Sequence, residues 1–196
     1  MKICVLFTGT ISTGKTTLLE KVKKELDELR FSYSIITSVV RELVKKNIIE
    51  KEVDILANNK NQITITAEYT CQYWEKLQDD SIILLSDRSP IDLIAYSRCR
   101  KDASDYSNRL AERVLNNLFS FKGVKFLVFY FPPIIPFEKD EIREEKGRKK
   151  IDIEIKKILK EFKIPFIKME EADLQKRSNL IRDIIITYYT QSSSRD

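Results

Sequence analysis

Histidine is absent from this 196-residue sequence. Histidine-based metal sites, Ser-His-Asp triads and Cys-His catalytic pairs are therefore excluded. The three cysteines, Cys4, Cys71 and Cys99, show no CxxC spacing, and their odd number argues against a disulfide framework. This pattern favours a reducing compartment, so we expect a cytoplasmic protein.

Long apolar runs and glycine are also scarce. The first apolar run, residues 3–7, is too short for a signal peptide or a membrane span, so no membrane partner is expected. Glycine occurs four times, and two of the four are Gly9 and Gly14. This concentration indicates a turn with a special backbone between residues 9 and 14.

What is present suits one folded domain. Hydrophobic residues make up 42% of the chain and charged residues 33%, which supports a sizeable core under a solvated surface. The net charge of +5, from 35 basic and 30 acidic residues, fits a protein that handles phosphates, but also an ordinary lysine-rich surface. We expect a single domain over residues 1–190 and a frayed tail over residues 191–196.

Apolar patterning predicts an α/β fold. Five runs that are apolar throughout predict buried parallel strands, at residues 3–7, 33–36, 82–86, 124–130 and 165–169. Helical spacing is expected at residues 18–29, 52–78, 91–94, 110–118, 151–162 and 180–188, although Ile151, Ile153 and Ile155 also fit a strand. Strands that alternate with helices predict a doubly wound sheet with right-handed crossovers.

One segment interrupts this pattern. Residues 131–150 contain three prolines followed by a dense run of charges. The segment fits either a solvated loop or a mobile lid, at about residues 136–150, over an active site.

The spacing Gly9-x-x-x-x-Gly14-Lys15-Thr16 matches the P-loop in full, between a predicted strand and a predicted helix. Glycines let the backbone amides wrap a phosphate, and the following helix points its positive end at the same place. Lys15 would supply charge to the terminal phosphates, and the Thr16 hydroxyl would ligate Mg²⁺. The residues expected to bind ATP are Gly9, Thr10, Ser12, Thr13, Gly14, Lys15, Thr16 and Thr17.

Four further residues are candidates for catalysis or substrate binding. Asp87 follows the third predicted strand, where a carboxylate would orient Mg²⁺ or accept a proton, and Arg88 beside it would bind a phosphate or carboxylate. Arg41 and Glu42 follow the second strand at the same edge of the sheet. They suit acceptor binding, with Glu42 near sugar hydroxyls, but an exposed helix pair explains them too.

The charged segment adds Asp140 and Arg143. An arginine on a lid would close over the transferred phosphoryl group, but one more surface charge on a basic loop explains this residue equally well. Asp140 is a candidate substrate-binding residue and Arg143 a candidate catalytic one.

In this order, the pieces "GTISTGKTTL", "VVREL", "DRSPIDLIAY", "FYFPPIIPFEKDEIR" and "RKKIDIEIKKILKEFKIPFIKM" resemble the ribosylnicotinamide kinase domain of the bacterial NAD-regulator protein. The resemblance spans residues 3–169. It implies a nucleoside- and nucleotide-kinase-like P-loop fold, with a five-stranded parallel sheet, ATP and Mg²⁺. It also implies that Asp87 is the catalytic acid, that Glu42 lies toward the substrate sugar and that Arg143 belongs to the lid.

The favoured function is phosphoryl transfer from ATP to a hydroxyl of a small nucleoside-like acceptor. A kinase acting on a nucleotide or a nucleic-acid hydroxyl stays open, as does a regulatory ATPase with water as the acceptor. A GTPase is disfavoured because no Asn-Lys-x-Asp sequence occurs, although residues 58–62 superficially resemble one. A nucleic-acid-binding module is disfavoured by the small basic excess.

Overall fold

The computed structural model describes residues 1–49, 61–100, 105–137 and 147–193. The strands are β1 (Lys2–Thr8), β2 (Tyr33–Ile36), β3 (Ile83–Ser86), β4 (Val124–Tyr130) and β5 (Ile167–Lys168). The helices are α1 (Lys15–Glu28), α2 (Val39–Lys45), α3 (Gln62–Gln78), α4 (Pro90–Cys99), α5 (Asp105–Phe119), α6 (Arg148–Glu161) and α7 (Leu174–Ser193).

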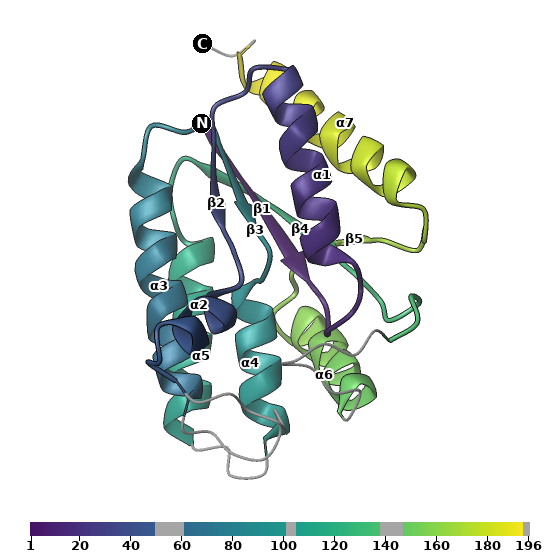
Figure 1. Cartoon of the computed structure of the whole chain (residues 1–196). Coiled ribbons are helices and arrows are strands. Elements are labelled where there is room, and N and C mark those ends of the chain that lie inside the picture. Colours follow the sequence, from purple (N-terminus) through teal and green to yellow (C-terminus); the bar gives the residue numbers. More distant parts are fainter. Residues whose placement is uncertain (50–60, 101–104, 138–146, 194–196) are drawn as a thin grey trace.

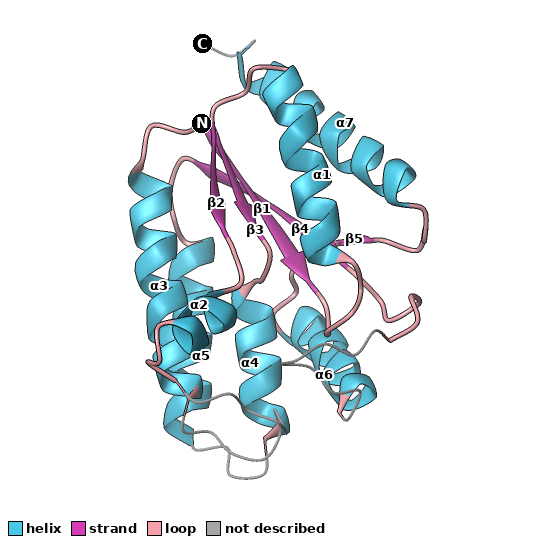
Figure 2. Ribbon diagram, viewed as in Figure 1, coloured by secondary structure: helices cyan, strands magenta, loops and turns pink. Residues whose placement is uncertain are grey.

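The strands form one parallel sheet in the order β2-β3-β1-β4-β5 (Figure 2). The predicted five-stranded α/β fold is therefore confirmed. β1 lies in the centre, with Val5 opposite Leu85 of β3 on one side and Leu127 of β4 on the other. Because all strands run the same way, their carboxyl ends meet at one edge of the sheet.

Successive residues of β1 supply two separate cores, as the two-residue period of a strand requires. Ile3, Val5 and Phe7 join a cluster with residues of α1 and α7, whereas Cys4 and Leu6 join a cluster with residues of α2 to α6. Helices thus cover both faces of the sheet (Figure 1). This double burial explains why the strands read as uninterrupted apolar runs.

Several boundaries differ from the sequence-based expectation. The helix expected over residues 52–78 begins at Gln62 in the described part of the chain, and residues 50–60 lie outside it. Residues 148–150, expected to belong to a lid, form the first turn of α6. α7 continues to Ser193, past residue 190.

The ambiguous isoleucines belong to a helix. Ile151 and Ile155 are buried while Ile153 is 54% exposed, which places two of them on the inner face of α6 and one outside. β5 is shorter than predicted because it pairs with β4 alone, and Phe166 just before it is exposed. No helix within the described ranges is both long and apolar enough to cross a membrane.

Candidate functional site

The loop between β1 and α1 has the backbone that its glycines allow. Gly14 adopts φ 78° immediately before α1 begins at Lys15. Gly9 adopts φ 154°, and a Cβ there would lie 2.6 Å from the carbonyl oxygen of Phe131. Both positions therefore exclude larger residues, which keeps the loop tight against the end of β4.

The ammonium group of Lys15 lies inside this loop. Lys15 Nζ donates hydrogen bonds to the carbonyl oxygens of Gly9 (2.8 Å) and Thr10 (2.6 Å) and to Thr13 Oγ1 (2.9 Å). The side chain is buried. A buried ammonium group that contacts carbonyl and hydroxyl oxygens of this loop is well placed to exchange these bonds for phosphate oxygens.

Asp87 connects β3 to the same loop. Thr16 Oγ1 donates a hydrogen bond to Asp87 Oδ2 at 2.8 Å, and the Asp87 amide donates to the carbonyl of Ile36 at 3.0 Å. Asp87 Oδ1 is buried and has no hydrogen-bond partner among the described residues. The Asp87 carboxylate and the Thr16 hydroxyl together offer the hard oxygen ligands that Mg²⁺ prefers.

The described residues contain no group of three or more acidic or cysteine side chains that would hold a metal ion by themselves. Thr16 and Asp87 nevertheless fit Mg²⁺, because this ion is usually held by one or two protein oxygens together with substrate phosphates and water.

Arg88 contacts the P-loop through one nitrogen of its guanidinium group. Its Nη1 donates to the carbonyl of Gly9 at 2.9 Å and lies 3.9 Å from Asp92 Oδ1. The guanidinium carbon stands 5.5 Å from the centre of the Tyr96 ring. Burial acts to lower the pKa of Arg88, but Tyr96, Asp92 and other facing groups raise it above its ordinary value, so the charge is retained.

Asp92 is a site residue that we did not expect from the sequence. It is 1% exposed, and its Oδ1 accepts hydrogen bonds from the Gly9 amide (2.9 Å) and the Thr8 hydroxyl (3.2 Å). Its Oδ2 accepts from the amide of Ser89, completing a capping box at the start of α4. One carboxylate therefore joins the P-loop to the segment that carries Asp87.

Tyr73 of α3 contacts the segment of residues 86–88 that carries Asp87. Its buried hydroxyl donates to the carbonyl of Arg88 at 2.6 Å and lies 2.8 Å from Ser86 Oγ. Burial raises the pKa of Tyr73 well above its ordinary value, so the hydroxyl keeps its proton as a donor.

Two buried arginines, which we also did not single out from the sequence, donate hydrogen bonds to carbonyl oxygens of the loop. Arg177 of α7 is 1% exposed, and its Nη1 donates to the carbonyl of Thr13 at 3.0 Å, while its Nε donates to the carbonyl of Glu171. Burial lowers the pKa of Arg177. Arg148 of α6 donates from Nη2 to the carbonyls of Ser12 (3.0 Å) and Ile135 (2.6 Å).

A cavity of about 430 Å³ opens above the loop. It is lined by Ser12, Thr13, Gly14, Lys15, Thr16, Thr17, Ser38, Arg41, Asp87, Arg88, Ile135, Pro136, Ala172, Leu174 and Arg177. The structure thus brings most of the predicted site residues to one place, at the carboxyl edge of the sheet.

Some predicted residues lie elsewhere. Glu42 does not line this cavity, and its carboxylate accepts a hydrogen bond from Thr37 Oγ1 at 2.8 Å. Gly9 and Thr10 are buried and do not line this cavity. Asp140 and Arg143 fall outside the described residues.

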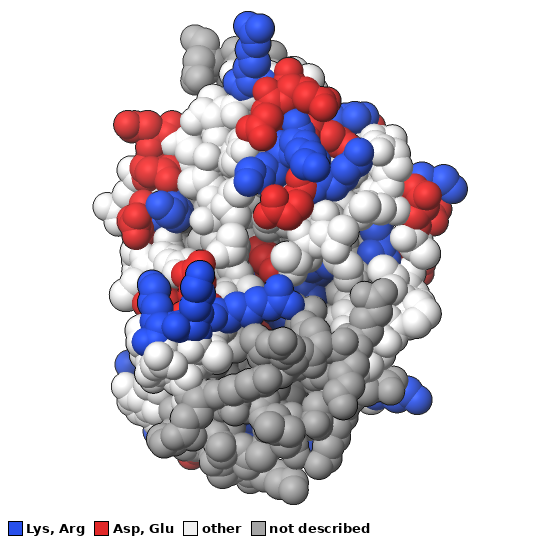
Figure 3. All heavy atoms as spheres, viewed as in Figure 1, with Lys and Arg blue, Asp and Glu red and all other residues white. Residues whose placement is uncertain are grey.

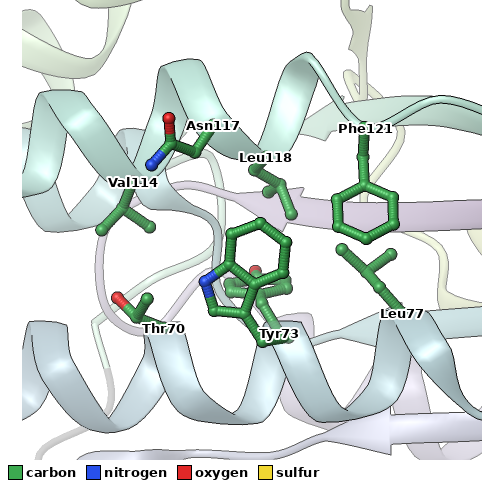
Figure 4. A pocket seen from close by; sticks show the side chains of 8 residues that line it. Thr70, Tyr73, Leu77, Val114, Asn117, Leu118 and Phe121 are labelled. Atoms are coloured by element: carbon green, nitrogen blue, oxygen red, sulfur yellow. The ribbon is translucent and has the colours of Figure 1, made fainter.

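A second hollow lies between α3 and α5, where Trp74 and Phe121 face each other with ring centres 5.1 Å apart (Figure 4). Its volume of about 20 Å³ is comparable to the space that one water molecule occupies, so it does not compete with the larger cavity as a ligand site.

Comparison with known proteins agrees with this geometry. A family model described as an AAA domain matches residues 4–177, which is most of the chain. The chain belongs to this AAA domain family. No curated protein sequence matches the chain.

Solved structures share the fold of this AAA domain at low identity. Two NadR structures, one in complex with NR and one with NAD and AMP-PNP, match with TM-scores of 0.62 and 0.66 at 17% and 18% identity. They cover 87% and 95% of this chain but only 46% and 49% of their own, so the chain spans about half the length of NadR. Thymidylate kinase from Ehrlichia chaffeensis matches with a TM-score of 0.62 at 13% identity, covering 94% and 98%. The fold is therefore that of the P-loop kinases.

Proposed function

We propose that this AAA domain transfers the terminal phosphoryl group of ATP to a hydroxyl of a nucleoside-like acceptor. The proposal rests on one observation, the cavity that the P-loop and the segment after β3 line together. In it a P-loop lysine, a threonine–aspartate pair and further arginines meet at the carboxyl edge of a parallel sheet. Phosphoryl transfer asks the protein mainly for positioning and for stabilisation of charge, which this set provides.

The donor phosphates would lie on the loop of residues 9–16. Lys15 would exchange its carbonyl partners for oxygens of the terminal phosphates, and the first amides of α1 would face the same oxygens. Thr16 Oγ1 and Asp87 Oδ2 would hold Mg²⁺, which neutralises phosphate charge when it is bound, so that Asp87 Oδ1 stays available to the acceptor.

The two sides of the cavity suit different halves of the reaction. Asp87 and Arg88 follow β3, on one side of the central strand β1. Ala172 precedes α7 and Leu174 begins it, and both follow β5, which lies on the other side of β1 in the sheet order. We assign the apolar side at Ala172 and Leu174 to the base and sugar of ATP, and the side at β3 to the acceptor.

Asp87 would receive the acceptor hydroxyl. Its unsatisfied Oδ1 would accept a hydrogen bond from this hydroxyl and take its proton as the oxygen attacks the terminal phosphorus atom. The bond between that phosphorus and the bridging oxygen breaks, and ADP leaves. From the family resemblance we also propose that Arg143 belongs to a lid and that Glu42 lies near the acceptor sugar. Asp140 is proposed as a substrate-binding residue from its place in the charged segment.

The three cysteines are free thiols, which supports a reducing, cytoplasmic setting. We propose residues 1–190 as one folded unit that includes its own lid.

The test is transfer of label. The full chain is incubated with γ-labelled ATP, Mg²⁺ and a panel of nucleosides, nucleotides and oligonucleotides. Label on an acceptor supports the kinase, whereas release of free phosphate that no acceptor changes would indicate a regulatory ATPase. Lys15→Ala should abolish either activity, and failure of the folded wild-type chain to bind magnesium–ATP in calorimetry would overturn the proposal.

A further inference from the structure

Resting on the proposed function, we infer that Tyr73 and Ser86 are positioning residues for phosphoryl transfer. Neither residue lines the cavity. Both contact the carbonyl oxygen of Arg88, and through it they orient the carboxylate of the preceding residue, Asp87. The two hydroxyls therefore affect the rate of transfer rather than the affinity for ATP, because the nucleotide would bind to the P-loop.

The backbone is fixed on both sides of Asp87. Its own amide donates to the carbonyl of Ile36 at 3.0 Å. The peptide unit between Arg88 and Ser89 is bonded at both of its ends, because the Ser89 amide donates to Asp92 Oδ2 at 2.9 Å and the Arg88 carbonyl accepts from a buried hydroxyl. With both neighbouring peptide units held, the backbone at Asp87 has little freedom to change the direction of its carboxylate.

The Arg88 carbonyl has two hydroxyl neighbours. Tyr73 Oη and Ser86 Oγ each lie 2.6 Å from this oxygen and 2.8 Å from each other. Three oxygen atoms thus make three close contacts, whereas the two hydroxyls carry only two protons. Both protons cannot lie between the two hydroxyls, so at least one of them is donated to the carbonyl. If either hydroxyl is removed, the other can still serve as the donor.

Both hydroxyls are shielded from solvent. Tyr73 is 2% exposed and Ser86 is 0% exposed, and burial keeps the pKa of Tyr73 well above its ordinary value, so its proton stays available for donation. If both hydroxyls were removed, the buried Arg88 carbonyl would lack these donors, and the cost of leaving it unsatisfied would favour rotation of its peptide unit. Such a rotation would turn Asp87 away from Thr16.

A double-mutant cycle tests the inference. Tyr73→Phe, Ser86→Ala and the double variant are compared with wild type for turnover, measured as label leaving γ-labelled ATP with Mg²⁺ and the acceptor panel present. Each single variant keeps one donor, so we expect kcat to fall no more than about threefold. The double variant should lose about 30- to 100-fold, which exceeds the product of the single effects. The dissociation constant for AMP-PNP with Mg²⁺ should stay within about twofold of wild type in all three.

A weaker donor provides a second variant. Ser86→Cys in the Tyr73→Phe background supplies a thiol, which donates hydrogen bonds weakly, so its kcat should fall about tenfold, between the single variants and the Ser86→Ala double variant. This variant tests the same carbonyl even if the Ser86→Ala double variant fails to fold, and a wild-type kcat in it would contradict the inference.

Two matched variants serve as controls. Tyr130→Phe removes another buried tyrosine hydroxyl, which donates to Asp152 Oδ1 at 2.6 Å and does not line the cavity. Figure 3 shows Lys and Arg side chains gathered over α2, where Lys45 is exposed, and Lys45→Gln removes one of these charges. Both controls should keep the wild-type kcat. Circular dichroism and the melting temperature establish that each variant is folded.

The outcomes separate this inference from the function on which it rests. Single effects that merely multiply in the folded double variant, or a wild-type kcat there, would overturn it. An equal loss of kcat in Tyr130→Phe would also overturn it, as would a loss of AMP-PNP affinity as large as the loss of kcat. A wild-type chain that binds AMP-PNP but releases no label from ATP would instead overturn the proposed function, and with it the inference.

Discussion

Thr16 Oγ1 and Asp87 Oδ2 lie 2.8 Å apart, joined by a hydrogen bond between residues that are 71 positions apart in the chain. The threonine is the second residue of α1, and the aspartate directly follows the neighbouring strand β3. Their contact holds in one geometry the hydroxyl and the carboxylate that we propose as ligands of Mg²⁺. Preorganisation of this kind lowers the cost of assembling charge in a transition state.

Asp87→Asn should separate ATP binding from turnover. The asparagine oxygen can still accept the hydrogen bond from Thr16, so we expect the fold and the dissociation constant for ATP to change little. The loss of the carboxylate charge should lower kcat by about 10²- to 10⁴-fold. Asp80→Asn, at an exposed position, is the matched control, and full turnover in Asp87→Asn would remove this residue from catalysis.

Arg177→Met should weaken nucleotide binding from outside the P-loop. The change removes the donors to Thr13 and Glu171 and so frees the turn that precedes Gly14. We expect the dissociation constant for magnesium–ATP to rise about tenfold, and Arg177→Lys to restore part of the loss.

Arg182→Met controls for the loss of an arginine on the same helix, because Arg182 pairs with Asp183 and Glu25 and does not line the cavity. Calorimetric titration and the melting temperature are measured on all three variants. A lower melting temperature with wild-type nucleotide affinity in Arg177→Met would show that Arg177 supports the fold only.

The sheet was predictable because its strands are buried on both faces. The runs 3–7 and 82–86 match the buried strands β1 and β3 to within one residue at each end, since double burial leaves no polar alternation in the pattern, and the runs 33–36 and 124–130 coincide with β2 and β4. The P-loop was equally predictable from the sequence, because its glycines adopt positive φ angles and its lysine follows the second glycine at a fixed spacing. The least accurate strand was β5, an edge strand of two residues next to the exposed Phe166.

The supports of the P-loop were not predictable from the sequence. Arg177 reaches Thr13 across 164 positions, and nothing in the helical pattern around it distinguishes a buried arginine from a surface one. For Asp92 one of its two roles could be predicted, since Ser89-x-x-Asp92 is a capping box that marks the start of α4. Its bond to the amide of Gly9, 83 positions away, depends on how β1 and β3 are paired.

Asp92→Ala should destabilise the fold as well as the site. The change leaves the buried amides of Gly9 and Ser89 without their acceptor. We expect a loss of about 2–4 kcal/mol in the free energy of unfolding, measured by urea denaturation. Asp92→Asn keeps one acceptor oxygen and should lose less, whereas equal stability of all three proteins would contradict this role.

The ion pair between Lys2 and Asp79 should make stability depend on pH. Lys2 Nζ lies 2.7 Å from Asp79 Oδ1 and also donates to the carbonyls of Lys76 and Asp79, which ties the start of β1 to the end of α3. Burial acts to raise the pKa of Asp79, but hydrogen bonds from Lys2 and Ser81 outweigh it and lower the pKa from 3.8 to about 2.

A lowered carboxyl pKa stabilises the folded state above the unfolded pKa, and this contribution is lost as the pH falls from about 4 to about 2. Because the Asp79 side chain is 33% exposed, we expect Asp79→Asn to cost about 1 kcal/mol at pH 7, after allowance for solvent screening. Urea denaturation at pH 7, 4 and 3 should show the difference from wild type narrowing toward the lowest pH. Asp80→Asn, next in the chain and exposed, should show no such trend, and a difference for Asp79→Asn that stays constant down to pH 3 would contradict the ion pair as its cause.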